Sequence, residues 1–143
     1  MKHILPFILS VFISTPSIAD DFSLAGTWRP LSKAGEVITG VIKIKESTIS
    51  WGVIKGADTS PCTATYSVDN SNYPDSITIT LLESECIPEH FLNRHISTNV
   101  KYFRFKEFRM HNSSIVAEVE HYKDGNINKN LSGSSLYIKN AVQ

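Results

Sequence analysis

The chain has 143 residues, 41% of them hydrophobic, and its 14 basic residues balance its 14 acidic residues. This length predicts a single domain. The balanced charge argues against nucleic-acid binding, which is typical of proteins with a clustered positive excess.

The first residues have the pattern of a secretory signal peptide. A short basic start precedes the apolar run 4–13, and the small residues Ser17 and Ala19 occupy the positions that a signal peptidase recognises. We therefore expect a leader over 1–19 and a single barrel domain over 20–143. The apolar run is far shorter than the ~20 residues of a membrane span, and no cysteine follows the cut, so no membrane anchor is expected. The expected location is periplasmic or secreted, and the compact leader favours a Gram-negative periplasm.

Beyond the leader, short runs that alternate apolar and polar residues are separated by turn-forming residues, a pattern typical of β-strands. The isolated glycines Gly40 and Gly52 suggest bends or bulges in these strands. About eight antiparallel strands joined by short turns predict an all-β, up-and-down barrel, because closure removes exposed sheet edges. A two-sheet sandwich is the alternative, and whether the last strand pairs with the first stays open. The expected strands begin near Gly26 and cover 36–45, 48–54, 62–69, 76–82, 97–110, 115–122 and 131–139.

Two cysteines, Cys62 and Cys86, lie in the expected domain. In an oxidising compartment an isolated pair indicates one disulfide, with two buried free thiols as the alternative. The disulfide would close a loop of about 25 residues and stabilise the fold by about 3 kcal/mol. Cys86 lies in the segment 83–96, which lacks alternation and is predicted to be a long loop.

The motif Gly26-Thr27-Trp28 opens the all-β part of the chain. A glycine permits a sharp backbone turn, and an indole two residues later can close one end of a barrel with its N–H near backbone acceptors. The motif resembles the opening of the lipocalin and avidin-like barrels, in which this Trp closes the barrel floor. The resemblance implies a late arginine stacked on the Trp, and here the last strand offers Lys139. The alternative is a glycine that precedes an ordinary core Trp.

Two functions of different classes follow. In the first, the protein is a non-enzymatic, lipocalin-like binding protein whose interior holds a small apolar ligand, without a cofactor. Large aromatic side chains predicted to face inward, together with Ile42 and Ile79, would line the site. These aromatic candidates are Trp28, Trp51, Tyr66 and Phe103.

In the second, the protein is a periplasmic inhibitor or immunity protein that blocks a cell-wall hydrolase or toxin through its loops. A small barrel can be filled by its own side chains, which favours recognition by the surface. Enzymatic activity is a third hypothesis, and two observations argue against it. No Gly-x-Ser-x-Gly motif occurs, and the spacing of His90 and His95 fits no metal-binding motif. The glutamates of the segment 83–96 have an alternative interpretation, in which they form a solvated acidic face. The expected partner-binding residues are Glu83, Glu85, Glu89 and His90.

Overall fold

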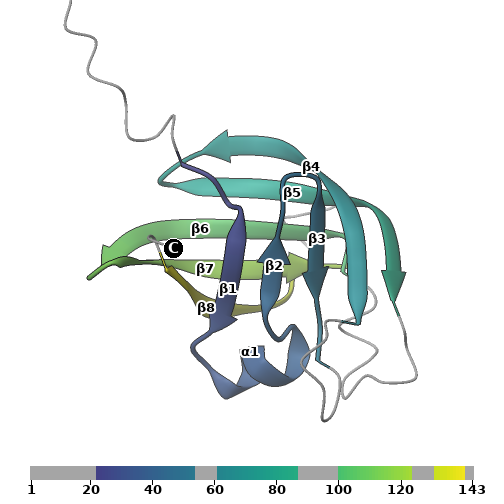
Figure 1. The fold of residues 1–143 in the computed structure, drawn as a ribbon, viewed down its shortest axis with the longest axis horizontal. Helices are drawn as coiled ribbons and strands as arrows, with labels where there is room; N and C mark the ends of the chain where they lie inside the picture. The colour runs from purple at the N-terminus through teal and green to yellow at the C-terminus, as the bar shows by residue number, and fades with distance from the viewer. Residues whose placement is uncertain (1–21, 54–60, 87–99, 124–130, 141–143) are drawn as a thin grey trace, which may run out of the picture.

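The computed structural model describes residues 22–53, 61–86, 100–123 and 131–140. They form a closed barrel of eight antiparallel strands, each paired with the next along the chain (Figure 1). The predicted up-and-down barrel is confirmed, and the sandwich alternative is wrong. The strands are β1 (Gly26–Pro30), β2 (Ile42–Ile44), β3 (Thr48–Trp51), β4 (Cys62–Asn72), β5 (Ser76–Cys86), β6 (Tyr102–His111), β7 (Ser114–Tyr122) and β8 (Leu131–Asn140).

The first and last strands close the barrel. Arg29 of β1 lies opposite Ile138 of β8, and Pro30 lies opposite Tyr137. This pairing answers the question that the sequence left open. Because every strand runs antiparallel to its neighbours, the ends of β1, β3, β5 and β7 meet at one end of the barrel, which we call the helix end. The opposite end, where the described chain enters β1, is the entry end (Figure 1).

The only described helix, α1 (Lys33–Ile38), lies at the helix end and corrects the predicted strand 36–45. Ser32 is the N-cap residue, and its hydroxyl accepts a hydrogen bond from the Gly35 backbone N–H at 3.1 Å. A serine cap followed by an acidic residue in the first turn stabilises a helix start. Only the end of the predicted strand, Ile42–Ile44, is extended.

The two isolated glycines lie just outside β2 and β3 and allow a close backbone approach. Gly40 has φ +60° and Gly52 φ +101°. The Gly52 backbone N–H donates to the Thr39 carbonyl at 2.6 Å. A Cβ at Gly40 would lie 2.7 Å from the Gly52 carbonyl oxygen, so this crossing requires glycine.

A bulge in β6 explains why its apolar residues do not alternate strictly. Glu107 has φ +54°, and the register with β7 shifts between Lys106 and Arg109. One extra residue reverses the side-chain alternation. Phe103, Phe105 and Phe108 are therefore all buried on the inner face.

β5 is longer than predicted and continues through Cys86, so the loop expected to begin at Glu83 is wrong over 83–86. A register shift against β4 accompanies this extension between Ala64 and Tyr66, where two residues of β5 lie opposite one of β4. Such a bulge breaks the alternation that sequence patterns rely on. The rest of the predicted loop, 87–96, lies outside the described residues.

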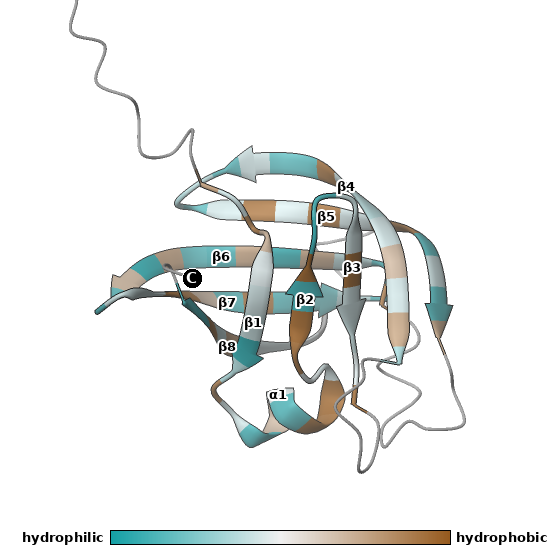
Figure 2. Cartoon of the chain, viewed as in Figure 1, coloured by the Kyte–Doolittle hydropathy of each residue, from teal (hydrophilic) through white to brown (hydrophobic). Residues whose placement is uncertain are grey.

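The predicted leader, 1–19, also lies outside the described residues. Within the parts of the chain that are described, no helix is long and apolar enough to cross a membrane. Apolar residues alternate with polar ones along most strands (Figure 2), as expected for a sheet with one buried and one solvated face.

Candidate functional site

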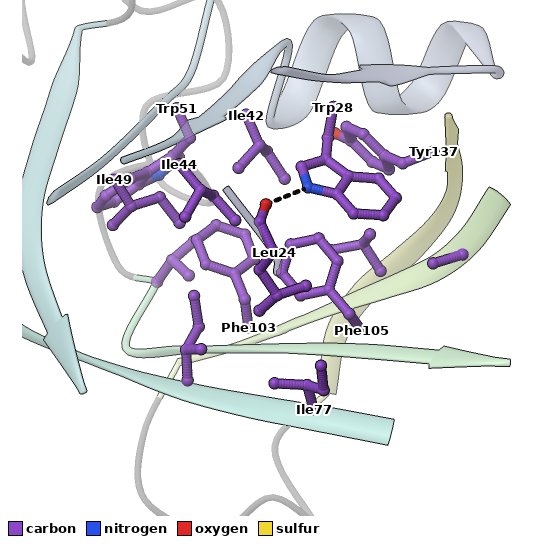
Figure 3. Close-up of a cluster of buried hydrophobic side chains, with 14 of the residues drawn as sticks. Leu24, Trp28, Ile42, Ile44, Ile49, Trp51, Ile77, Phe103, Phe105 and Tyr137 are labelled. Carbon is purple, nitrogen blue, oxygen red and sulfur yellow. Dashed lines mark hydrogen bonds between the residues drawn. The ribbon is translucent and has the colours of Figure 1, made fainter. Parts of the chain in front are cut away.

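The entry end is organised around Trp28, which is fully buried. Its indole N–H donates to the Leu24 carbonyl at 2.9 Å (Figure 3). Lys139 Nζ on β8 donates to the carbonyls of Ser23 at 2.7 Å and Ala25 at 2.9 Å. Both hydrogen-bonding side chains therefore hold the segment before β1 against the barrel.

Lys139 also takes the place that the lipocalin-like motif implies for an arginine. Its Nζ lies 5.3 Å from the ring centroids of both Trp28 and Phe22, within the range of a cation–π contact. Burial lowers the pKa of Lys139. The structure therefore has a Trp–lysine pair at this end of the barrel, where the resemblance implies an arginine.

Aromatic rings fill the space at the entry end. Phe22 stacks on Tyr73 at 4.0 Å between centroids, and Phe108 meets Phe22 edge-on at 5.0 Å. Phe108 also lies 6.3 Å from Trp28. Edge-to-face arrangements such as that of Phe22 and Phe108 are favourable for aromatic pairs. Side chains of the protein therefore fill the inside of the barrel at this end.

Three of the four predicted ligand-lining residues lie together in the barrel interior (Figure 3). Trp28, Trp51 and Phe103 are each 0% exposed. Trp51 and Phe103 form an edge-to-face pair at 5.6 Å, and Trp28 packs on Phe105 at 5.2 Å. Ile42 and Ile79 are buried in the same cluster. The sequence did select interior positions, and their burial shows that they pack against one another.

Tyr66, the fourth predicted residue, has a different role. It is only partly buried against the core. Its hydroxyl donates to the backbone carbonyls of Lys45 at 2.6 Å and Glu46 at 3.2 Å. Desolvation, and the Glu46 carboxylate in second place, raise the pKa of Tyr66. Tyr66 therefore ties β4 to the β2–β3 turn.

At the helix end, the Tyr137 hydroxyl joins β8 to the chain that follows α1. It donates to the Gly40 carbonyl at 2.9 Å and makes a short hydrogen bond with the Thr39 hydroxyl. Desolvation raises the pKa of Tyr137 to about 12. Ser135 is the next inward-facing residue of β8 on the side of the helix end. Its hydroxyl accepts a hydrogen bond from the Ser32 hydroxyl at 3.4 Å.

His121 also faces inward at the helix end, and it was not among the residues predicted from the sequence. It continues the inner face of Ile115, Ala117 and Val119 on β7, and it is 5% exposed. Its Nδ1 is buried and has no hydrogen-bond partner in the described structure. Desolvation lowers the pKa of His121 to about 4. The period-2 pattern of β7 was the signal that could have revealed this residue.

We expect His121 to make the fold sensitive to mild acid. Its folded pKa lies below the ordinary value of 6.5, so the unfolded chain binds the proton first as pH falls. Stability is then lost from about pH 6.5 down to about pH 4, with a loss of about 2 kcal/mol by pH 5. Urea unfolding of the wild type and of His121→Leu at pH 7.5 and pH 5 measures this difference.

The exposed His111 provides the matched control, because its side chain lies outside the barrel interior. Between pH 7.5 and pH 5, the free energy of unfolding of His111→Leu should fall as much as that of the wild type. The fall in His121→Leu should be about 2 kcal/mol smaller. Equal acid sensitivity in all three proteins would contradict this account of His121.

The predicted partner-binding residues are placed only in part. Glu83 and Glu85 are exposed near the end of β5, beyond its pairing with β6. Glu89 and His90 lie outside the described residues. The predicted disulfide is confirmed: Cys62 and Cys86 are directly paired across β4 and β5 and are bonded. The disulfide therefore holds the strand end that carries Glu83 and Glu85.

The outer face of β6 and β7 carries a compact charge network. Arg104 binds Glu120 through Nε at 2.8 Å and Nη2 at 2.7 Å, and Lys106 Nζ lies 3.5 Å from the same carboxylate. Desolvation and the hydrogen bond to Glu120 raise the pKa of Tyr122 to about 12. Because the carboxylate is already paired with two cations, we interpret the network as a structural one.

Among the described residues, no group of three or more His, Cys, Asp or Glu side chains is placed to hold a metal ion. One open depression on the outside of the barrel lies beside the β6 bulge, over Arg104 and Phe108, and another lies between Leu31 and Leu136 of β8. Neither depression includes a predicted site residue.

Comparison with known proteins gives no match: no family model, no curated protein and no solved structure is similar to this chain.

Proposed function

We propose that this protein is a non-enzymatic binding protein of the lipocalin-like barrel type, located in the periplasm or secreted. The observation that supports this most directly is the asymmetry of the barrel interior. Aromatic side chains and Lys139 fill the entry end, whereas the helix end holds the Trp51–Phe103 pair together with an inward-facing polar atom, His121 Nδ1, that has no partner in the described structure. A small, mainly apolar ligand would bind at the helix end.

The charged groups also favour binding over catalysis. The buried carboxylate of Glu120 lies on the outer face and is paired with Arg104 and Lys106. The polar groups described on the inner face at the helix end are hydroxyls and one imidazole. A disulfide is typical of an oxidising compartment, which supports the periplasmic or extracellular location.

A second candidate function is inhibition or immunity through contact with another protein. It is favoured by the exposed carboxylates Glu83 and Glu85 on a strand end that the Cys62–Cys86 disulfide holds in place. A rigid, acidic projection suits a basic cleft, because preorganisation lowers the entropic cost of binding. The filled middle of the barrel also fits recognition by the surface.

Native mass spectrometry of the full chain, expressed with its own leader and purified oxidised from periplasmic extract, tests both functions. We expect one small molecule bound per chain. Its occupancy should fall in Trp51→Phe and Phe103→Leu, which alter the wall near His121. A retained protein in place of a small molecule would favour the second function.

The second function has its own matched variants. Glu83→Gln and Glu85→Gln should release a bound protein, whereas Glu46→Gln should not. Glu46 is also an exposed residue, and it lies in the β2–β3 turn at the entry end. A chain that retains neither a small molecule nor a protein would contradict both functions.

A further inference from the structure

The residues that precede β1, 22–25, lie against the entry end but outside the strands, and we call them the N-terminal strap. The carbonyls of residues 23–25 each accept one hydrogen bond from a side chain of the barrel. Lys139 Nζ donates to the first at 2.7 Å and to the third at 2.9 Å. The Trp28 indole N–H donates to the second at 2.9 Å (Figure 3). The barrel therefore holds the strap through backbone carbonyls, which every peptide has.

Two alternate side chains of the strap make the apolar contacts. The Phe22 ring stacks on Tyr73 at 4.0 Å between centroids and meets Phe108 edge-on at 5.0 Å. Lys139 Nζ lies 5.3 Å from the centroid of the same ring. Leu24 is buried in the core cluster, whereas the residues on either side of it are exposed. The site at the entry end therefore selects an aromatic residue and, two positions later, an aliphatic one.

Gly26 joins the strap to β1 and is the point at which the strap can turn away. Its φ is +132°, and a Cβ there would lie 2.8 Å from the Cδ atom of Lys139. Glycine permits both this backbone conformation and the close approach. The pairing of β1 with β2 begins at Gly26 itself, so departure of the strap would break no strand pairing.

The groups that hold the strap make an empty site unfavourable. Without the strap, the Lys139 ammonium and the Trp28 indole N–H would both lose their described acceptors. Lys139 is buried, and a buried cation without an acceptor is costly. The rings of Tyr73 and Phe108 would also lose the ring that packs between them. The strap should therefore leave only in exchange for a ligand that supplies the same groups.

We propose that the entry end is a peptide-binding site, which the chain's own strap occupies until a peptide segment of another protein displaces it. The segment has an aromatic residue followed two positions later by an aliphatic one. Its carbonyls accept from Lys139 and Trp28, and its ring takes the place of Phe22. A small ring compound would not supply three successive carbonyls together with both side chains. This site is separate from the one proposed at the helix end and does not depend on it.

NMR titration of the full chain with two capped tetrapeptides tests the proposal. One peptide, acetyl-FSLA-amide, repeats the strap, and the other, acetyl-ASLA-amide, lacks the ring. A free peptide competes with a tethered strap, whose effective concentration is on the order of millimolar. Phe22→Ala weakens this competitor, so it should raise the affinity for acetyl-FSLA-amide about tenfold. Ala25→Ser changes an exposed position of the same strap and should leave the affinity within about twofold.

The spectra of the wild type show whether the strap is displaced, so the test does not depend on the variants alone. At saturation with acetyl-FSLA-amide, the Leu24 methyl resonances should move toward their values in an unfolded chain, because the strap leaves the core. The Trp28 indole N–H should keep the chemical shift of a hydrogen-bonded group, because a carbonyl of the peptide replaces that of Leu24. A peptide that binds elsewhere would leave the Leu24 methyl resonances in place.

Several results would overturn the peptide site. They are no binding of acetyl-FSLA-amide to the wild type or to Phe22→Ala, equal affinity for the two peptides, and binding that leaves Leu24 in the core. A wild-type dimer that the peptide dissociates would assign the site to the strap of a second copy and overturn the role of a different protein. Tighter binding in Phe22→Ala, together with displacement of Leu24 in the wild type, would support the proposal.

Discussion

Replacing Trp28 with alanine is expected to lower the free energy of unfolding by about 3–5 kcal/mol, the largest effect that we expect from a single substitution in this barrel. The indole is fully buried and contacts Phe105 and Phe108, so its removal leaves a cavity between two other rings. The Leu24 carbonyl would also lose its hydrogen-bond donor. Urea denaturation followed by circular dichroism measures the change.

Two further variants separate the causes. Trp28→Phe keeps a ring but removes the N–H, so it should lose part of the stability through the unpaired Leu24 carbonyl, about 1–3 kcal/mol. Leu82→Ala removes an apolar side chain that is 59% exposed, and it should change stability by less than about 0.5 kcal/mol. A loss below about 1 kcal/mol in Trp28→Ala would show that the entry end is not organised around this residue.

Removing the Cys62–Cys86 disulfide is expected to lower the free energy of unfolding by about 3 kcal/mol. The cysteines are separated by 24 positions and are directly opposite each other on β4 and β5. The bond stabilises the fold chiefly because it limits the conformations of the unfolded chain. The measurement is urea unfolding of the wild type with and without a reductant, beside the double variant Cys62→Ala and Cys86→Ala.

The double variant controls for effects of the reductant on the rest of the chain. It should unfold at the same urea concentration with and without reductant, close to the reduced wild type. Cys62 is 0% exposed, so its alanine also leaves a small cavity and the double variant should be slightly less stable than the reduced wild type. Equal stability of oxidised and reduced wild type would contradict the prediction.

Most of the fold could be predicted from alternation alone. β7 and β8 match their predicted ranges closely, because each has one buried face and period-2 alternation shows this directly. The predictions were wrong where alternation fails. Because of the bulge at Glu107, alternation does not predict that Phe103, Phe105 and Phe108 share one face. The helix α1 depends on a serine cap within a segment rich in β-branched residues.

The candidate site could be predicted less well. Trp28, Trp51 and Phe103 were selected for their size, and the structure places them in the core. Tyr66 was selected by the same criterion, but its hydroxyl reaches the β2–β3 turn. His121 was not selected, although it continues the period-2 inner face of Ile115, Ala117 and Val119. Its pairing with Phe103 and Gly133 shows which residues lie beside it.

The sequence by itself determined the all-β class, the number and direction of the strands, the cysteine pair and the position of the Trp at the head of the first strand. These follow from local patterns, since turn residues, alternation and cysteine count act over short distances. The tertiary structure alone decided which groups lack partners. The contact between Lys139 and the Trp28 ring joins residues about a hundred positions apart in the sequence. His121 Nδ1 has no partner among the described residues, and this depends on how three neighbouring strands pack. Barrel closure brings these residues together, and short-range sequence patterns do not predict which distant residues will meet.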